Sequence, residues 1–343
     1  MNLKLTFSFL LIFGFANLSI CQHLYPIVAD GRAGFIDKSG KVIISPQFDE
    51  GFDFAGQYGR IKLNGKFGFI DHQGKIIIEP QYDNARDFSE GLACVSKDGT
   101  WMYINEKGET IITLKDADYA YSFSEGLARY HHIEKETKKD DYGYVNSKGE
   151  IVIAPKYHLA YDFKEGMARA SLTGEKWGFI DKSGKLIIEE KFEACFDFWE
   201  GFANVRIGNE KDGKWGFIDK SGTIKLEAKF DKAFYFDEDR AIIREGNMKD
   251  GKYGFIDKEG EIIIKPEYDG AHHFQDGLAC VGKNEGRDMV WGYVDPNGKL
   301  TIPFNYSEPA EFVNGLAYVK MTDSKTTKEG YINHKGDFIW TKK

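Results

Sequence analysis

The stretch Lys214-Trp215-Gly216-Phe217-Ile218-Asp219 decides the fold, because the same order of residue types returns along the chain. It alternates with a period of two, which places Trp215 and Phe217 on one face of an extended segment and Gly216 and Ile218 on the other. Each recurrence therefore predicts a β-strand.

The recurrence has a regular period. Each copy is anchored by a glycine, or once by a methionine, at the position of Gly216. These anchors are Gly34, Gly68, Met102, Gly143, Gly178, Gly216, Gly254, Gly292 and Gly330. Their spacings are 34, 34, 41, 35, 38, 38, 38 and 38 residues, and periods of this size are typical of propellers and solenoids. The chain is predicted to be a repeat protein.

The rest of each unit has three parts. An Asp-Lys-Ser-Gly turn, as at 181–184, predicts a tight hairpin after the first strand. A branched apolar run such as Ile262-Ile263-Ile264 predicts a second strand covered on both faces. A loop with proline and an aromatic residue then leads to a short third strand of small residues, as at Leu92-Ala93-Cys94-Val95.

We therefore expect an all-β array of about eight to nine three-stranded antiparallel modules. The units lie near 31–62, 65–97, 99–130, 141–171, 175–206, 213–244, 251–282, 290–320 and 329–341. We favour an open, curved solenoid, because Ala33 and Glu329 replace the aromatic residue in the end copies, as degenerate caps of an open stack would, and nine blades exceed the usual ~4–8 of a propeller. The alternative is a closed propeller-like ring, in which the lone strand at 24–28 and the last two strands, ending at Trp340, complete one module.

The composite unit resembles the WG-repeat family, also called KWG repeats. The Lys-Trp-Gly-Phe-Ile-Asp core is followed by Gly-Lys-Ile-Ile and then by Phe-Ser-Glu-Gly-Leu-Ala, from about residue 24 to the C-terminus. Met102 departs from the core, and Asp239-Arg240-Ala241 departs from the last motif. The resemblance implies a β-repeat architecture found in many bacterial proteins, and no shared catalytic activity.

The N-terminus predicts export. Lys4 and the apolar run Leu5 to Phe15 resemble a signal peptide, which we assign to residues 1–21, leaving residues 22–343 as a single repeat domain. The run is shorter than the ~20 residues of a membrane-spanning helix, so no transmembrane span is expected after its removal. The product is expected to be periplasmic, at the cell surface or secreted, and the alternative is a lipoprotein anchored through Cys21.

Charge and motifs narrow the function. The chain has 46 Lys and Arg against 54 Asp and Glu, a net charge of −8 without a basic patch, which argues against a nucleic-acid partner. It contains no nucleophile elbow, phosphate-binding glycine loop or zinc-protease helix. We therefore predict neither an enzyme nor a cofactor or metal, and we name no catalytic or ligand-binding residue.

Several residues are candidates for a metal-binding or ligand-binding site. The turn acids Asp37, Asp71, Asp181, Asp219, Asp257 and Asp295 resemble calcium ligands, but Asn105, Asn146 and Asn333 replace them elsewhere, so turn capping is the better explanation. Four histidines occur in two adjacent pairs without metal-ligand spacing: His131, His132, His272 and His273. We expect Cys94, Cys195 and Cys280 to be small buried or half-buried thiols. Trp199 fits an exposed ligand platform and a core position equally.

The longer connections are the one indication of a site. They lie between the third strand of one unit and the first strand of the next, at 132–140, 208–212, 283–288 and 321–328. If the modules stack regularly, these connections share an edge, where a rigid scaffold usually carries its binding surface. We predict an exported, non-enzymatic scaffold that binds a protein or glycan there. The alternatives are a glycan-acting hydrolase, whose carboxylate pair is recognised only in three dimensions, and a purely structural envelope protein.

Overall fold

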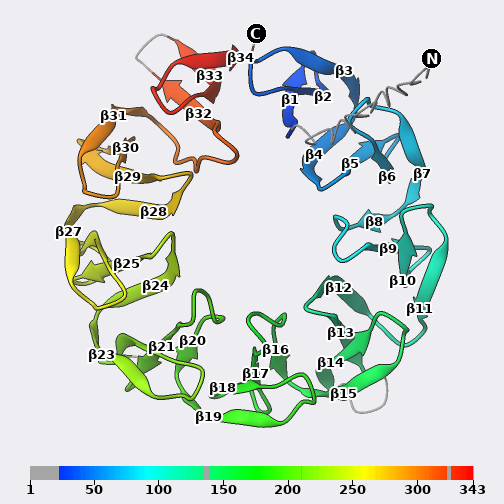
Figure 1. Ribbon diagram of the computed structural model, residues 1–343, viewed down its shortest axis with the longest axis horizontal. Coiled ribbons are helices and arrows are strands. Elements are labelled where there is room, and N and C mark those ends of the chain that lie inside the picture. The colour runs from blue at the N-terminus through cyan, green and yellow to red at the C-terminus, as the bar shows by residue number, and fades with distance from the viewer. Residues whose placement is uncertain (1–22, 135–138, 210, 323–325, 343) are drawn as a thin grey trace, which may run out of the picture.

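The computed structural model describes residues 23–134, 139–209, 211–322 and 326–342, and every regular element in these ranges is a β-strand. The strands form nine antiparallel sheets, seven with four strands and two with three. Figure 1 shows the sheets as blades around a common axis, and we number them 1 to 9 in chain order. The chain is thus a closed nine-bladed propeller, so the favoured open solenoid was wrong and the alternative ring is correct.

The four positions of a blade are called A to D from the axis outwards. Position A holds β4 (Glu50–Ala55), β8 (Asn84–Ala85), β12 (Tyr119–Ser124), β16 (Leu159–Ala160), β20 (Ala194–Cys195), β24 (Lys232–Asp237) and β28 (Gly270–Gln275). Position B holds β1 (Tyr25–Ala29), β5 (Tyr58–Leu63), β9 (Leu92–Lys97), β13 (Leu127–Ile133), β17 (Ala168–Ser171), β21 (Ala203–Ile207), β25 (Arg240–Glu245), β29 (Leu278–Glu285) and β32 (Ala317–Thr322).

The two outer positions contain the aromatic-glycine strand and the branched strand of each repeat. Position C holds β2 (Arg32–Ile36), β6 (Lys66–Ile70), β10 (Thr100–Asn105), β14 (Asp140–Asn146), β18 (Trp177–Ile180), β22 (Lys214–Ile218), β26 (Lys252–Ile256), β30 (Asp288–Val294) and β33 (Thr327–Ile332). Position D holds β3 (Val42–Phe48), β7 (Ile76–Tyr82), β11 (Thr110–Leu114), β15 (Ile151–Tyr157), β19 (Leu186–Phe192), β23 (Ile224–Phe230), β27 (Ile262–Tyr268), β31 (Leu300–Tyr306) and β34 (Phe338–Thr341).

Two predictions about the module need correction. The segment after the proline was expected to be a loop, but in blades 2 to 8 it contains strand A, so these modules have four strands. Strand D was expected to be covered on both faces. It is the outermost strand, however, and its run alternates, with Ile262 47% exposed and Ile264 5% exposed.

Each sequence repeat is shared between two blades. Its first two strands are C and D of one blade, and its remaining part forms A and B of the next, so that β9, from one repeat, pairs with β10, from the following repeat. The lone strand β1 therefore pairs with β2 and β3 in blade 1, while β32 completes blade 9 with β33 and β34. The terminal strands do not share a sheet, unlike in the closed alternative that the sequence offered.

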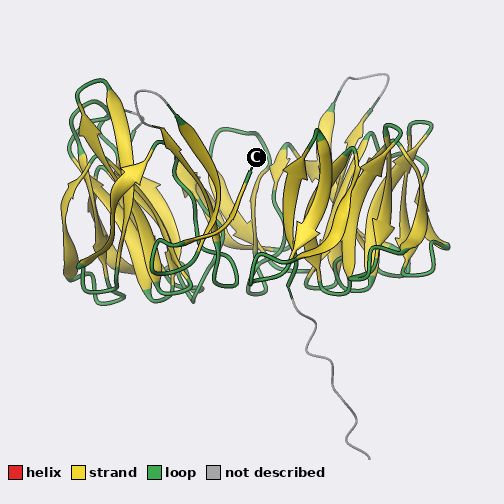
Figure 2. Cartoon of the chain, turned by 90° about the horizontal axis from the view of Figure 1, so that it is seen from above, coloured by secondary structure: helices red, strands yellow, loops and turns green. Residues whose placement is uncertain are grey.

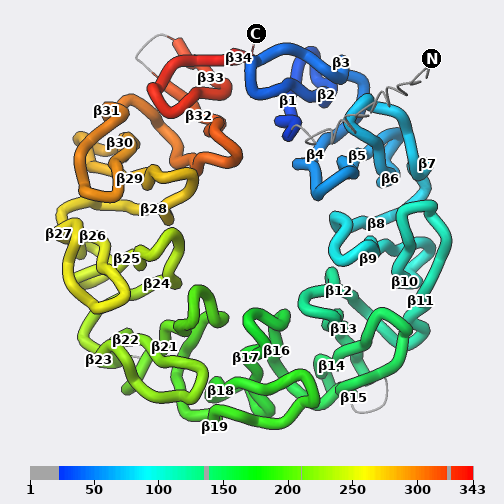
Figure 3. The backbone as a smooth tube through the Cα atoms, in the orientation of Figure 1, coloured from blue at the N-terminus to red at the C-terminus, as the bar shows by residue number. Residues whose placement is uncertain are grey.

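The ring closes by packing between blades 1 and 9, which lie side by side in Figure 3. Tyr25, Ile27 and Ile36 form a buried cluster with Leu316 and Tyr331. The Tyr25 hydroxyl donates to the Asn314 carbonyl oxygen at 2.7 Å, and the Tyr331 hydroxyl donates to the Pro26 carbonyl oxygen at 2.8 Å. The end copies are therefore not caps of an open stack, because their faces are buried against each other.

The anchoring glycine is required by an irregularity in strand D. Between Trp215 and Phe217 of β22, the partner moves from Phe230 to Leu226 of β23, which leaves extra residues in β23. The extra backbone lies over Gly216, where a Cβ atom would be 2.5 Å from the Leu226 carbonyl oxygen. In blade 3 the pairing of β10 with β11 is regular at this point, and Met102 occupies the position. The departure in that copy therefore has a local structural cause.

Acidic residues in the A–B turns link neighbouring blades. Glu125 accepts a hydrogen bond from the Gly166 backbone N–H at 2.8 Å, and the next blades repeat this arrangement. The further pairs are Glu90 with Gly126, Glu165 with Gly201, Glu200 with Asp239, Glu238 with Gly277 and Asp276 with Gly315. The Glu-Gly element of the repeat thus forms a hydrogen bond that links each of these blades to the next.

The antiparallel order gives the ring two distinct faces, and Figure 2 shows the strands running between them. Connections from B to C and from D to A open on one face, which we call the B–C face. Connections from A to B and from C to D open on the other, which we call the A–B face. No described residue belongs to a helix able to cross a membrane. Residues 1–22, with the predicted signal peptide and Cys21, lie outside the described ranges.

Candidate functional site

The longer connections singled out in the sequence all join a strand B to a strand C, so the ring places them on the B–C face. Part of 132–140, residue 210 within 208–212 and part of 321–328 lie outside the described residues. The segment 283–288 is an extension of the β29–β30 hairpin, in which Glu285 pairs with Asp288. The remaining connection, 208–212, borders a cavity together with a second connection that the sequence analysis did not identify.

The missed partner is the connection Gly246–Gly251 of blade 7. Together with Gly208–Gly213 of blade 6 it shows the pattern Gly-Asn-x-Lys-Asp-Gly. In the first, the Asn209 Oδ1 atom accepts bonds from the N–H groups of Lys211 and Asp212, both at 2.8 Å. In the second, Asn247 Oδ1 accepts from Lys249 and Asp250 in the same way, at 2.7 and 3.0 Å. The repeated motif was the sequence pattern that could have revealed this site.

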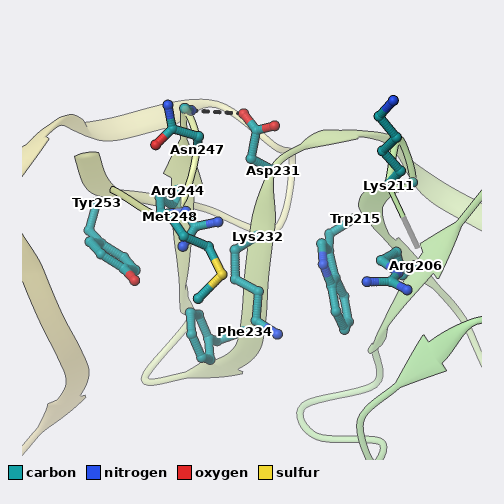
Figure 4. A pocket seen from close by; sticks show the side chains of 12 residues that line it. Arg206, Lys211, Trp215, Asp231, Lys232, Phe234, Arg244, Asn247, Met248 and Tyr253 are labelled. Carbon is teal, nitrogen blue, oxygen red and sulfur yellow. Dashed lines mark hydrogen bonds between the residues drawn. The ribbon is translucent and has the colours of Figure 1, made fainter. Parts of the chain in front are cut away.

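Between these connections lies a cavity of about 540 Å³. Its lining residues are Arg206, Lys211, Gly213, Trp215, Asp231, Lys232, Phe234, Arg244, Gly246, Asn247, Met248 and Tyr253. Figure 4 shows Arg206 and Trp215 on the blade 6 side, with Lys232, Arg244 and Tyr253 on the blade 7 side. We call it the cationic pocket, because Arg206, Lys232 and Arg244 converge on it.

Aromatic rings fix the central cation. The Lys232 Nζ atom lies 4.2 Å from the centroid of the Trp215 ring and 5.4 Å from that of Phe234. Trp215 is buried, so this contact is a desolvated cation–π interaction that orients the ammonium group. Burial, followed by the charges of Arg244 and Arg206, lowers the pKa of Lys232. The site therefore holds positive charge at a cost in solvation and in mutual repulsion.

The acidic residue of the pocket is already engaged. Asp231 accepts hydrogen bonds from Lys214 Nζ at 2.5 Å and from the Gly246 N–H at 2.8 Å. Burial acts to raise the pKa of Asp231, but these two bonds and nearby cations outweigh it and hold the pKa below its ordinary value. Within the described residues no ion pair joins Arg206, Lys232 or Arg244 to a carboxylate.

Two arginine nitrogen atoms at the cationic pocket also lack hydrogen-bond acceptors among the described residues. The Nε atoms of Arg206 and Arg244 are buried and have no hydrogen-bond partner among the residues that the structure describes. A buried donor without an acceptor costs about 1–3 kcal/mol, and more when it is charged. A bound carboxylate, phosphate or sulfate would offset the positive charges of Arg206, Lys211, Lys232 and Arg244.

A neighbouring cavity provides a contrast. At the joint of blades 8 and 9 a cavity of about 740 Å³ also opens on the B–C face. Its cation Lys320 is paired with Glu308 at 2.7 Å, and Glu285 and Asp288 add negative charge. Size therefore does not distinguish the cationic pocket. What distinguishes it is that Arg206, Lys232 and Arg244 form no ion pair within the part of the chain that the structure describes.

The turn acids have the structural role that the sequence favoured. Asp181 Oδ1 accepts from the Ser183 N–H at 2.9 Å, from the Ser183 hydroxyl at 2.6 Å and from the Lys185 N–H at 3.0 Å. Asn105 Oδ1 accepts from its own turn in the same manner. The turn-capping interpretation is confirmed, and no group of three or more potential metal ligands occurs in the described part of the chain.

The histidine pairs lie in different blades and do not meet. His131 contacts Asp140, and His132 bonds the Asp116 carbonyl oxygen. His272 lies 3.4 Å from Glu311, whereas His273 is buried and stacks on Tyr235.

The structure also shows the environments of the three cysteines and of Trp199. Cys94, Cys195 and Cys280 are free and buried, as predicted. Burial raises the pKa of the Cys94 and Cys280 thiols to about 12. Trp199 is 40% exposed and belongs to a second, smaller pocket near the axis.

Comparisons with known proteins agree with this architecture. The model of a family described as WG containing repeat matches residues 34–67, 67–101, 101–130, 142–176, 177–210, 215–248, 253–286 and 291–325. No curated protein matches the chain in sequence.

Among solved structures, a eukaryotic initiation factor superposes with a TM-score of 0.64 at 10% identity, over 94% of this chain and 98% of that one. Dipeptidyl peptidase 4 of Porphyromonas gingivalis gives 0.49 at 10% identity, over 94% and 58%. BamB from Moraxella catarrhalis gives 0.41 at 12% identity, over 79% and 95%. At 10% identity the likeness to the initiation factor shows a shared fold alone.

Proposed function

The chain belongs to the WG-containing repeat family, and from this premise we propose that it is an exported, non-enzymatic scaffold whose cationic pocket binds an anionic group of a protein or glycan partner. The observation that carries the proposal is the convergence of Arg206, Lys232 and Arg244, none of which forms an ion pair with a carboxylate among the described residues. In a chain of net charge −8, such a cluster persists at the expense of stability, as binding sites commonly do.

The position of the pocket supports the same function. It opens on the B–C face between two connections of matching sequence, and variable connections on a rigid ring are the usual carriers of recognition. Arg206, Lys232 and Arg244 converge in one cavity, with Lys211 also in its lining, and this arrangement suits a carboxylate, phosphate or sulfate group. A nucleic-acid backbone would require a basic stripe along the surface, and the charge of this chain is not arranged so.

Three variants of the purified protein test this function. Lys232→Met and Arg244→Met remove pocket cations, and Lys220→Met is the matched control, since Lys220 pairs with Glu165 on the A–B face. The probes are an array of anionic and neutral glycans and a pull-down from envelope proteins. We expect an anionic probe to bind the wild type and the control, and each pocket variant to bind about tenfold more weakly.

The other outcomes are equally informative. Equal binding by Lys232→Met and the wild type would show that the cationic pocket does not bind the anionic probe. Failure of the wild type to bind either set would favour a purely structural envelope role, and release of reducing sugar from the array would favour the hydrolase. Export is tested separately: the N-terminal sequence of the protein recovered from cells should begin at Gln22, and a lipid-modified Cys21 would establish the anchored form instead.

A further inference from the structure

One position of the repeat changes its role halfway around the ring. It is the residue that follows the phenylalanine of each inner segment. In blades 3 and 4 it is a serine: the Ser89 hydroxyl donates to the Phe123 carbonyl oxygen at 2.7 Å, and the Ser124 hydroxyl donates to the Phe163 carbonyl oxygen at 2.6 Å. Each serine therefore ties its blade to the next one. In blades 5 to 8 the position holds Lys164, Trp199, Asp237 and Gln275.

These four side chains meet in one cavity of about 390 Å³, which we call the rim pocket. Phe196, Asp197 and Tyr235 also line it. Because A–B turns and inner strands form it, the rim pocket lies near the axis toward the A–B face, away from the cationic pocket on the B–C face. Adjacent blades thus contribute one chemically different side chain each, at a position that is structural elsewhere.

The aromatic part of the rim pocket is pre-organised. The Trp199 ring lies 6.0 Å, centroid to centroid, from the Tyr235 ring, and Trp199 is 40% exposed. Tyr235 is held from behind by His273, whose ring stacks on it at 3.8 Å with an interplanar angle of 14°. Burial lowers the pKa of His273 to about 4, so this backing ring is neutral at neutral pH. The exposed indole is a flat apolar platform on a rigid support.

The polar part offers both donors and acceptors. Gln275 Nε2 donates to Asp237 Oδ2, and Lys164 Nζ lies 5.6 Å from the centroid of the Trp199 ring. Burial, with Glu200 and Glu238 nearby, raises the pKa of Asp237 to about 6, so its carboxylate remains an acceptor at neutral pH.

The second carboxylate of the rim pocket has a structural role. Asp197 pairs with Arg169 at 2.7 Å, and Asp87 and Asp162 pair with arginines at the corresponding position in other blades. Asp237 is therefore the carboxylate that remains for a ligand.

We propose that the rim pocket is a subsite for a neutral saccharide ring, which lies on the Trp199 indole while its hydroxyl groups contact Asp237, Gln275 and Lys164. A sugar has an apolar ring face and hydroxyls that both donate and accept, which matches this mixture of groups. An amine ligand fits less well because the Lys164 ammonium group, 5.6 Å from the centroid of the indole, would repel a second positive charge there. Hydrolysis fits less well because it needs two available carboxyl groups, and Asp197 is held by Arg169.

The test is a titration of the purified protein with neutral mono- and disaccharides, including glucose, galactose, N-acetylglucosamine and cellobiose, followed by tryptophan emission and calorimetry. We expect at least one of them to bind the wild type. Trp199→Ala and Asp237→Asn should each weaken binding about tenfold or more. Ser124→Ala, at the same repeat position in blade 4, should bind like the wild type, and so should Arg244→Met in the cationic pocket.

Each remaining outcome counts against the proposal. It is overturned if no neutral sugar of the panel binds, or if Asp237→Asn and Trp199→Ala, with circular dichroism like that of the wild type, bind as the wild type does. Release of glucose from cellobiose, which requires water to cleave the glycosidic bond, would make the rim pocket a hydrolytic site instead. Because the cationic pocket is tested with anionic probes and the rim pocket with neutral sugars, failure of one site is distinguishable from failure of the other.

Discussion

The joint between blades 4 and 5 and the joint between blades 6 and 7 are built from the same two repeat positions with different chemistry. At the first, Arg129 of strand B donates to the Ala160 carbonyl oxygen and lies 3.2 Å from Asp162. At the second, neutral Asn204 donates to the equivalent Ala233 carbonyl oxygen at 2.8 Å, and Tyr235 replaces the aspartate. The backbone contact is kept, while the charge pair is absent.

The difference separates two uses of positive charge. Arg60, Arg129 and Arg169 are each paired with an aspartate of the next blade and lie over an aromatic ring of their own blade. The cations of the 6/7 joint lie nearer the B–C face and have no such aspartate. Paired cations thus fasten the ring, whereas unpaired cations are available to a ligand.

The largest effect should come from breaking a paired joint. Asp162→Ala leaves the Arg129 guanidinium, 9% exposed, without its counter-charge. We expect a loss of about 2–3 kcal/mol in the free energy of unfolding, less than the ~3–5 kcal/mol of a fully buried pair because Asp162 is itself partly exposed. Chemical denaturation measures it. Tyr235→Phe, at the same repeat position of the 6/7 joint, is the control and should change stability by no more than about 0.5 kcal/mol; losses of similar size would erase the distinction between the joints.

A smaller effect is expected at the closing joint, where hydrogen bonds take the place of a charge pair. Tyr331→Phe removes the bond to the Pro26 carbonyl oxygen and leaves the ring packing intact. The expected cost is about 1 kcal/mol in the free energy of unfolding. Tyr318→Phe is the control, since its hydroxyl bonds Glu329 within the same blade. Hydrogen exchange of blade 1 should quicken in Tyr331→Phe alone, and unchanged exchange there would mean that the bond does not help to hold the ends together.

In the rim pocket, substitution of Asp237 should raise the free energy of unfolding rather than lower it. Because the pKa of Asp237 is raised to about 6 from an unfolded value near 4, the folded protein binds this proton more tightly, and its stability falls as the pH rises from about 4 to about 6. Asp237→Asn should therefore be more stable than the wild type near neutral pH, by no more than about 1 kcal/mol after solvent screening, with the gap closing below about pH 4. Unfolding midpoints across this range decide it, and a variant less stable at neutral pH would show that Asp237 supports the fold.

The smallest effect is expected in the turns. Asp181→Asn should change the free energy of unfolding by no more than about 0.5 kcal/mol, because Asn146 caps an equivalent turn with the same two backbone bonds. Asp181→Ala, which removes the acceptor, should cost about 1 kcal/mol. If the asparagine variant lost as much as the alanine variant, the carboxylate charge rather than the acceptor geometry would be needed.

The sequence predicted what depends on local chemistry. The alternation around Trp215, the Asp-x-x-Gly turns and the period of the copies correctly placed strands C and D, the hairpin between them and strand B. Ring closure depends instead on packing between blades 1 and 9, which are far apart in the chain. The residue types at Ala33 and Glu329 do not reveal that packing. Strand A was missed because it is as short as two residues in β8 and follows a proline, a pattern also typical of a loop.

The candidate site was predicted in part. The B–C connections were expected to share an edge, and they do. The cations of the pocket were not identified, because Arg206, Lys232 and Arg244 occupy ordinary strand positions and converge only when blades 6 and 7 meet. Comparing the two Gly-Asn-x-Lys-Asp-Gly connections would have drawn attention to this joint.

The most direct test of the account is a calorimetric titration of the wild type, Lys232→Met and Lys220→Met with a sulfated disaccharide, at low and at high salt. The account predicts that the wild type and Lys220→Met bind it, that added salt weakens the binding, and that Lys232→Met binds about tenfold more weakly. Equal affinity in Lys232→Met and the wild type, or no binding by either, would contradict the claim that unpaired cations between blades 6 and 7 form the recognition site.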